Sequence, residues 1–326
     1  MHSRVKGVRA RNFIALIAGG AALILCVSIP WIETKGGTGG YLTQVSTLLL
    51  IYMTMAVAWN LIGGYGGQYS LGHAAFFGVG AYTGGLLRTV GLGMPEAILI
   101  GGVSAAIIAL PTIPTFKLRG VYFCVATLFL DQGLLYLYTS MTPITGGGNG
   151  LYFKPLLYST SVFFYASLAL VVAAMLTTRF VLRSRIGLAL KAIRDEEEAA
   201  QSLGINASLY KSYALLLSAF FFGLTGGLYM ATQVFIDPPI AFSLGWSFDP
   251  IFMAIIGGAG TLVGPIIGTI IVSIVDQIAI GYGTASALIN GVLFVGMMVI
   301  APHGVYGVIR QLIVSGRERK WTRSPC

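Results

Sequence analysis

The chain has 326 residues, of which 56% are hydrophobic and only 10% are charged, and its mean hydropathy is +0.83. Soluble domains typically carry about 25% charged residues, so this composition excludes an ordinary soluble protein and predicts a polytopic membrane protein. The net charge of +9 does not indicate a nucleic-acid partner, because the basic residues lie in short loops and near both ends, as in the positive-inside pattern.

Apolar runs fill most of the chain, and six or more of them approach or exceed the roughly 18 to 20 residues that cross a bilayer. No segment resembling a soluble domain separates them, so we predict a single transmembrane domain over residues 1–326. Basic residues precede the first run, 13–30, as in a signal peptide. Its length and the lack of a small-x-small cleavage site predict that it stays as the first span, with the N-terminus inside.

A glycine-rich segment, residues 63–87, follows the second predicted span at 42–62. In a membrane, glycine allows close helix contact and allows the backbone to break where it lines a cavity. Gln68, Ser70 and His73 stand at this break and are candidates for a transport pathway. A lone histidine is more often a hydrogen-bonded structural residue, so that interpretation of His73 stays open.

Two adjacent polar residues, Asp131 and Gln132, lie within the predicted span 121–140, which follows a span at 96–114. Burying a carboxylate in hydrocarbon costs several kcal/mol, so Asp131 is expected to face other helices, a water-filled cavity or a partner group. A packing hydrogen bond and a place on the solute pathway are both compatible with the pattern. Residues 142–159 are predicted to form an outside loop, and 161–178 the next span.

The segment 187–204, GLALKAIRDEEEAAQSLG, is the most highly charged part of the chain. Strong helix formers with apolar residues at three- and four-residue steps predict one amphipathic helix. Its apolar positions are Leu188, Ala192, Ile193, Ala199, Ala200 and Leu203. Flanking basic residues predict a cytoplasmic position. From the residues alone, a solvated helix between two spans explains the segment equally well.

The stretch 248–277 is interrupted by glycines and Pro265, which predicts either one bent span or two short ones. A last span at 286–302 precedes a basic tail that is expected in the cytoplasm. Termini on the same side require an even number of crossings, so we expect an all-α membrane bundle of about 8–10 transmembrane helices with glycine-broken spans. A faint likeness between 63–87 and 255–272 suggests an internal repeat.

Signatures of enzymes are missing from the sequence. The GxxxxGK[ST], HExxH and GxSxG patterns do not occur, and the histidines are scattered at positions 2, 73 and 303. Cys26, Cys124 and Cys326 are too far apart for a metal-ligand motif. We therefore predict no catalytic residues, no metal and no cofactor, and we assign any ATP hydrolysis to another chain.

Glu198 to Gly204, EAAQSLG, resembles the EAA-x-x-x-G loop of ABC-importer permeases, the element that docks on the ATP-binding subunit. Four further stretches resemble branched-chain amino-acid permeases of the LivM/LivH type. They are GQYSLGHAAFFGVGAYTGGLL from Gly67, LRGVYFCVATL from Leu118, TGGGNGL from Thr145 and IIGGAGTLVGPIIG from Ile255. The LRGVYF stretch, the TGG loop and the long charged linker favour the LivM-like subunit.

This resemblance implies a non-enzymatic permease subunit of an ATP-driven importer in the bacterial inner membrane, multi-pass, with both termini cytoplasmic. Its partners would be a LivH-like second permease, two cytoplasmic ATP-binding subunits and an extracytoplasmic solute-binding protein. Solutes would be branched-chain amino acids, or related small amino acids, urea or amides. Segment 187–204 would be the coupling helix, with its ATPase-coupling residues at Arg194, Asp195, Glu198, Ala199, Ala200 and Gly204.

The alternative from another class is a secondary transporter driven by an ion gradient, with Asp131 or Asp276 as the proton or sodium site. The EAA-like segment has no clear role in that alternative.

Overall fold

The computed structural model describes residues 40–118, 120–153 and 159–281, together with residue 30 and short pieces at 288, 291–292, 294–296 and 304–307. The predicted first span (13–30), most of the predicted last span (286–302) and the basic tail lie outside the described residues. The predicted cytoplasmic position of both termini lies outside them too.

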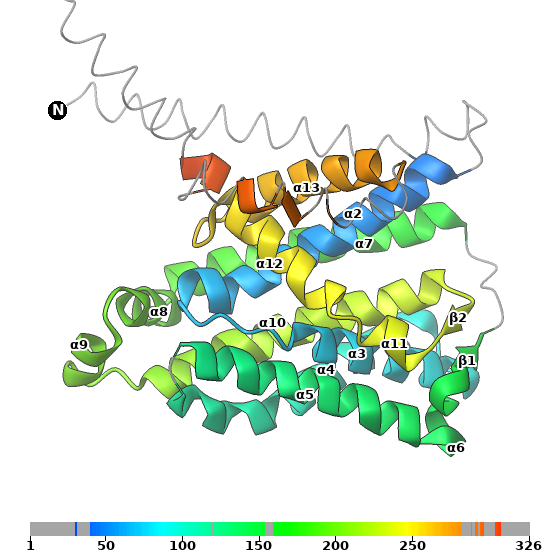
Figure 1. The fold of residues 1–326 in the computed structure, drawn as a ribbon, viewed down its shortest axis with the longest axis horizontal. Helices are drawn as coiled ribbons and strands as arrows, with labels where there is room; N and C mark the ends of the chain where they lie inside the picture. The colour runs from blue at the N-terminus through cyan, green and yellow to red at the C-terminus, as the bar shows by residue number, and fades with distance from the viewer. Residues whose placement is uncertain are drawn as a thin grey trace, which may run out of the picture.

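The described chain is almost entirely helical, which confirms the prediction of an all-α bundle (Figure 1). The long helices are α2 (Tyr41–Asn60), α3 (His73–Thr89), α4 (Met94–Ala109), α5 (Val121–Ser140), α7 (Thr160–Arg183), α10 (Ala207–Thr232), α12 (Gly245–Gly258) and α13 (Gly264–Ile280). The shorter helices are η1 (Leu61–Tyr65), η2 (Leu110–Lys117), α6 (Thr142–Thr145), η3 (Gly147–Asn149), α8 (Arg185–Asp195), α9 (Glu197–Ser202) and α11 (Pro238–Ala241). Two short strands, β1 (Leu151–Tyr152) and β2 (Phe235–Ile236), pair antiparallel.

Six helical stretches in the described residues are long and apolar enough to cross a membrane. They are Tyr41–Tyr65, Met94–Lys117, Val121–Ser140, Thr160–Arg183, Ala207–Thr232 and Pro238–Gly258. Gly264–Ala279 is a shorter apolar helix, and α3 has 17 residues. The total number of crossings stays a prediction.

The glycine-interrupted stretch 248–277 forms two helices, so the two-segment alternative is the observed one. Helices α12 and α13 are separated at residues 259–263 and pack closely against each other. A Cβ added to Gly268 would overlap the carbonyl oxygen of Met253, and one added to Gly257 would overlap that of Gly264. Glycine is therefore required where the two backbones touch.

The core of the bundle lies where α3, α4 and α10 cross. Their contacts are made by glycines, because a Cβ on Gly80 would overlap the Gly223 carbonyl and a Cβ on Gly226 that of Phe77. Large aromatic side chains, among them Phe76, Phe77 and Phe222, are fully buried around this crossing. The hydrophobic effect contributes little to the association of helices within lipid. Close backbone packing of this kind therefore stabilises the contacts between membrane helices.

The two ends of the bundle carry different elements (Figure 1). Helices α8 and α9 lie at one end, and α6, β1, β2 and α11 lie at the other. The predicted cytoplasmic segment and the predicted outside loop thus occupy opposite ends, as their assignment to opposite sides of the membrane requires. The loop is more structured than predicted, because β1 within it pairs with β2, which follows α10.

Candidate functional site

The charged segment consists of two helices, which corrects the prediction of one continuous helix over 187–204. Helix α8 ends at Asp195, Glu196 is extended with φ −157° and ψ 103°, and α9 starts at Glu197. The acidic run explains the break. Carboxylates at a helix C-terminus oppose the helix dipole, whereas Glu197 and Glu198 in the first turn of α9 are favourable. We call residues 185–204 the α8–α9 linker.

Gly204 closes the linker in the left-handed region, with φ +83°. The amide of Ile205 donates to the carbonyl of Ala200 across this turn, at 3.1 Å. A residue with a Cβ would be strained there by roughly 1 kcal/mol. Glycine is therefore the residue best suited to the end of α9.

The residues of the predicted apolar face do not all point the same way: some pack against the bundle and others are exposed. Ile193 and Ala200 are buried and pack with Ala207 against the bundle. Leu188 and Leu203 point away from the bundle, with 67% and 83% of their surface exposed, and Ala199 is exposed beside them. Ala200 is thus packed within its own subunit, while the side chain of Ala199 is accessible to a partner protein.

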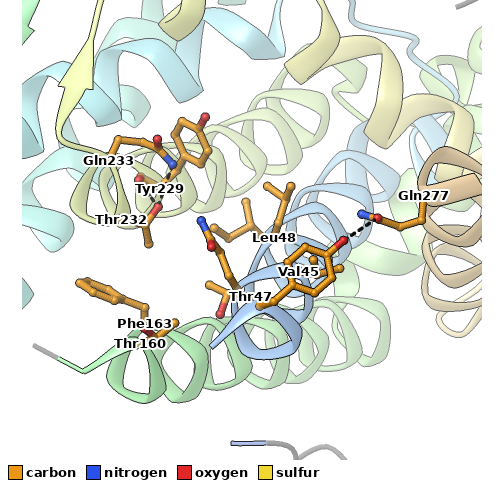
Figure 2. Close-up of a pocket in the computed structure, with 12 residues that line it drawn as sticks. Val45, Thr47, Leu48, Thr160, Phe163, Tyr229, Thr232, Gln233 and Gln277 are labelled. Atoms are coloured by element: carbon orange, nitrogen blue, oxygen red, sulfur yellow. Dashed lines mark hydrogen bonds between the residues drawn. The ribbon is translucent and has the colours of Figure 1, made fainter. Parts of the chain in front are cut away.

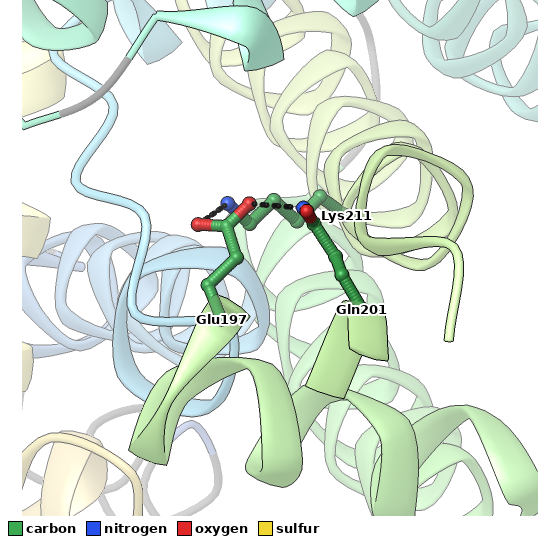
Figure 3. A network of polar contacts seen from close by, with 3 residues as sticks. All are labelled: Glu197, Gln201 and Lys211. Atoms are coloured by element: carbon green, nitrogen blue, oxygen red, sulfur yellow. Dashed lines mark hydrogen bonds and ion pairs between the residues drawn. The ribbon is translucent and has the colours of Figure 1, made fainter. Parts of the chain in front are cut away.

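An ion pair fixes α9 to α10 (Figure 3). The Nζ atom of Lys211 lies 2.8 Å from Oε2 of Glu197, with only 3% of the Lys211 side chain exposed and 28% of that of Glu197. Gln201 donates from Nε2 to the other carboxylate oxygen at 3.4 Å. A buried ammonium needs such a partner, because desolvation of an unpaired charge costs several kcal/mol.

Arg194 is an exposed residue whose guanidinium reaches the glycine-rich breaks of the bundle. Its Nη1 donates to the carbonyl oxygen of Gly64 at 2.8 Å. A Cβ added to Gly67 would lie 3.2 Å from Cγ of Arg194, and one added to Gly260 would overlap Nη1. The side chain therefore lies directly between the break that follows α2 and the break that follows α12.

Asn60, which directly precedes the first break, also contacts the second. Its Oδ1 accepts from the amide of Gly260 and its Nδ2 donates to the carbonyl of Thr261, both at 2.8 Å. Asn60 is the last residue of α2 and is 1% exposed. The two glycine-rich segments that resemble each other faintly in sequence thus meet in space, beside α8.

The residues predicted at the first break are buried and packed. Nε2 of His73 lies 2.9 Å from Oγ of Ser218, and the imidazole ring contacts Phe222 edge-on. The carbonyl of Ser70 accepts from Nε1 of Trp59 at 3.0 Å. Gln68 is also buried. Among the described residues, the Ser70 hydroxyl and Nδ1 of His73 are buried without a hydrogen-bond partner. A role of these residues in solute transport stays a prediction.

Asp131 is fully buried within the chain, so it does not face lipid. Its Oδ2 accepts from Nε2 of Gln132 at 3.0 Å. Within the part of the chain that is described, its Oδ1 has no hydrogen-bond partner. A second intramembrane carboxylate, Asp249 in α12, accepts from the Tyr52 hydroxyl at 3.4 Å. The sequence signal for Asp249 is a lone carboxylate in the apolar stretch that precedes the glycines of α12.

A cavity of about 540 Å³ is lined by residues near one end of the bundle (Figure 2), the end that lies opposite α8 and α9 in Figure 1. It lies between α2, α7, α10 and α13 and has uncharged polar and apolar walls. The lining residues are Tyr41, Gln44, Val45, Thr47, Leu48, Ile51, Thr160, Phe163, Tyr229, Thr232, Gln233 and Gln277. None of the predicted pathway residues lines it. Its signal in the sequence is a glutamine near the same end of α2, α10 and α13, namely Gln44, Gln233 and Gln277, which we did not predict.

The described residues contain no group of three or more His, Cys, Asp or Glu side chains that could hold a metal ion. The thiol of Cys124 donates to the carbonyl of Tyr69 at 3.0 Å, which places α5 against the first break.

Comparison with known proteins gives a consistent result. Residues 41–302 match the family model described as "Branched-chain amino acid transport system / permease component". The chain is 29% identical over 322 residues to the "High-affinity branched-chain amino acid transport system permease protein LivM" of Escherichia coli, covering 89% of this chain and 74% of that protein, and it matches the LivM of Salmonella typhimurium equally. It is 26% identical over 286 residues to the "Probable branched-chain amino acid transport permease protein LivH" of Methanocaldococcus jannaschii, covering 80% of this chain and 86% of that protein. No solved structure matches the chain significantly.

Proposed function

Because the chain belongs to the branched-chain amino acid transport permease family, we propose that it translocates branched-chain amino acids across the bacterial inner membrane as one permease subunit of an ATP-driven importer. The family match over residues 41–302 is the observation that carries this proposal. Related small amino acids, urea and amides are further candidate solutes, because the motifs do not separate them. The bundle of long apolar helices supports a multi-pass permease.

The proposed complex contains this chain, a LivH-like second permease, two cytoplasmic ATP-binding subunits and an extracytoplasmic solute-binding protein. Curated relatives of both the LivM and the LivH type match the chain, with the greater identity to LivM. This agrees with the LivM-like role inferred from the LRGVYF and TGG segments. ATP hydrolysis is assigned to the partner subunits.

The outer surface of the α8–α9 linker is the proposed docking site for the ATPase. Leu188, Ala199 and Leu203 are exposed there among charged side chains. Apolar side chains outside the membrane are normally buried away from water, so this exposed surface favours a partner. Asp195 and Glu198 are exposed beside them and would orient the partner during encounter. Arg194 and Ala200 are also proposed coupling residues, and both contact their own subunit, Arg194 through the Gly64 carbonyl and Ala200 through Ile193 and Ala207.

Replacing Leu203 by aspartate is expected to weaken ATPase docking about tenfold or more, since burying a leucine contributes roughly 1.5–3 kcal/mol. The subunit itself should keep its stability, because Leu203 is 83% exposed. The measurement is a titration of the ATPase onto membranes that contain the permease pair. Ser208→Asp is the matched control, because it adds the same charge at an exposed position and removes no apolar side chain. Equal ATPase affinity for both variants would exclude Leu203 from the interface.

A further inference from the structure

Two interruptions of the helical backbone converge on one side chain. The first is η1, a π-helix that continues α2 through Gly64, and the second is the turn between α12 and α13, where Gly260 has φ +76°. Arg194 donates to the Gly64 carbonyl at 2.8 Å and lies against Gly260. Non-helical backbone in a membrane protein is tolerated where protein covers it or where it lines a cavity, and π-helical turns often mark functional sites.

The contacts leave little room for independent movement of the three segments. A Cβ on Gly67 would lie 3.4 Å from Cα of Arg194, and one on Gly64 would overlap the side chain of Asn60. Asn60 in turn binds Gly260 and Thr261 through their backbone atoms. Arg194 from α8 and Asn60 from α2 therefore both contact the two breaks.

We propose that Arg194 is the positioning residue that transmits movement of the α8–α9 linker to both glycine-rich breaks; this inference rests on the proposed importer function. An arginine suits this role because its planar guanidinium presents several donors in a rigid arrangement, so displacement of α8 displaces the bonded carbonyl with it. Binding of the ATPase to the outer surface of the linker in this way displaces the backbone at the ends of α2 and α12. The solute path is opened by the breaks moving as one unit.

The test uses the complete complex in proteoliposomes, with solute uptake and ATP hydrolysis followed in parallel. Arg194→Ala is expected to lower the solute taken up per ATP at least about fivefold, within the range of typical coupling energies, while ATP hydrolysis continues. Arg194→Lys keeps the charge but loses the planar fork, and it should give an intermediate ratio. Arg183→Ala is the matched control, because it removes an exposed arginine from the last turn of α7 and should leave the ratio at the parental value.

Four outcomes are informative. A low ratio for Arg194→Ala with a parental ratio for Arg183→Ala supports the role of Arg194. A parental ratio for Arg194→Ala overturns it while leaving the importer function intact. If Arg194→Ala does not assemble, Arg194→Lys decides, and a parental ratio from that variant overturns the inference. Absence of ATP-driven uptake by the parent complex itself would overturn the proposed function and this inference with it.

Discussion

Replacing Gly226 by valine is expected to prevent the subunit from folding. A Cβ at this position in α10 would overlap the carbonyl oxygen of Phe77 in α3 and lie 3.0 Å from the amide nitrogen of Ala81. Backbone atoms cannot rotate away as side chains do, so the two helices would have to separate and expose the core around Phe222. We expect a loss of more than about 3 kcal/mol, at or above the upper end of overpacking effects.

The measurement is the amount of folded subunit in membranes and its thermal midpoint in detergent. Gly133→Val on α5 is the matched control, because a Cβ there meets no atom of the described residues within 4 Å. If Gly226→Val accumulates and unfolds at the same temperature as Gly133→Val, the close approach of α3 and α10 is wrong.

The second large effect is expected at the ion pair of Glu197 and Lys211. Glu197→Ala leaves a buried ammonium without its carboxylate and should destabilise the subunit by roughly 2–3 kcal/mol, somewhat less than a fully buried pair because water reaches the partly exposed site. Lys211→Met removes the charge itself and should cost less than Glu197→Ala. The double variant should recover most of the loss.

Thermal unfolding of the purified subunit and its three variants provides the double-mutant cycle. Strong non-additivity is the expected result. If the losses of the two single variants simply add in the double variant, Lys211 does not depend on Glu197, and the docking of α9 on α10 rests on the apolar contacts of Ala200 alone.

Much of the fold follows from local features of the sequence. The predicted span 121–140 coincides with α5, and the predicted span 42–62 agrees closely with α2 and the start of η1. Continuous apolar runs predict such helices, because each must satisfy its backbone hydrogen bonds within itself in lipid. Glycines at 63–87 and 257–264 likewise predicted that the backbone would be interrupted, and both interruptions are present.

The contacts between these segments could not be predicted from local pattern. The bond from Arg194 to Gly64 joins residues 130 positions apart, and the bond from Asn60 to Gly260 joins residues 200 positions apart. Nothing in a local window indicates that the Arg194 guanidinium contacts Gly64, because that contact depends on how distant segments pack. The cavity could not be predicted for the same reason, since its glutamines lie in or directly after three separate helices.

The most direct measurement is uptake of a labelled branched-chain amino acid into proteoliposomes that hold the complete complex, with ATP and the ion gradient varied independently. The account predicts that uptake requires both ATP and the solute-binding protein, and that ionophores which collapse proton and sodium gradients leave it unchanged. Uptake that follows an imposed proton or sodium gradient without ATP, and stops when an ionophore is added, would contradict the account and favour a secondary transporter.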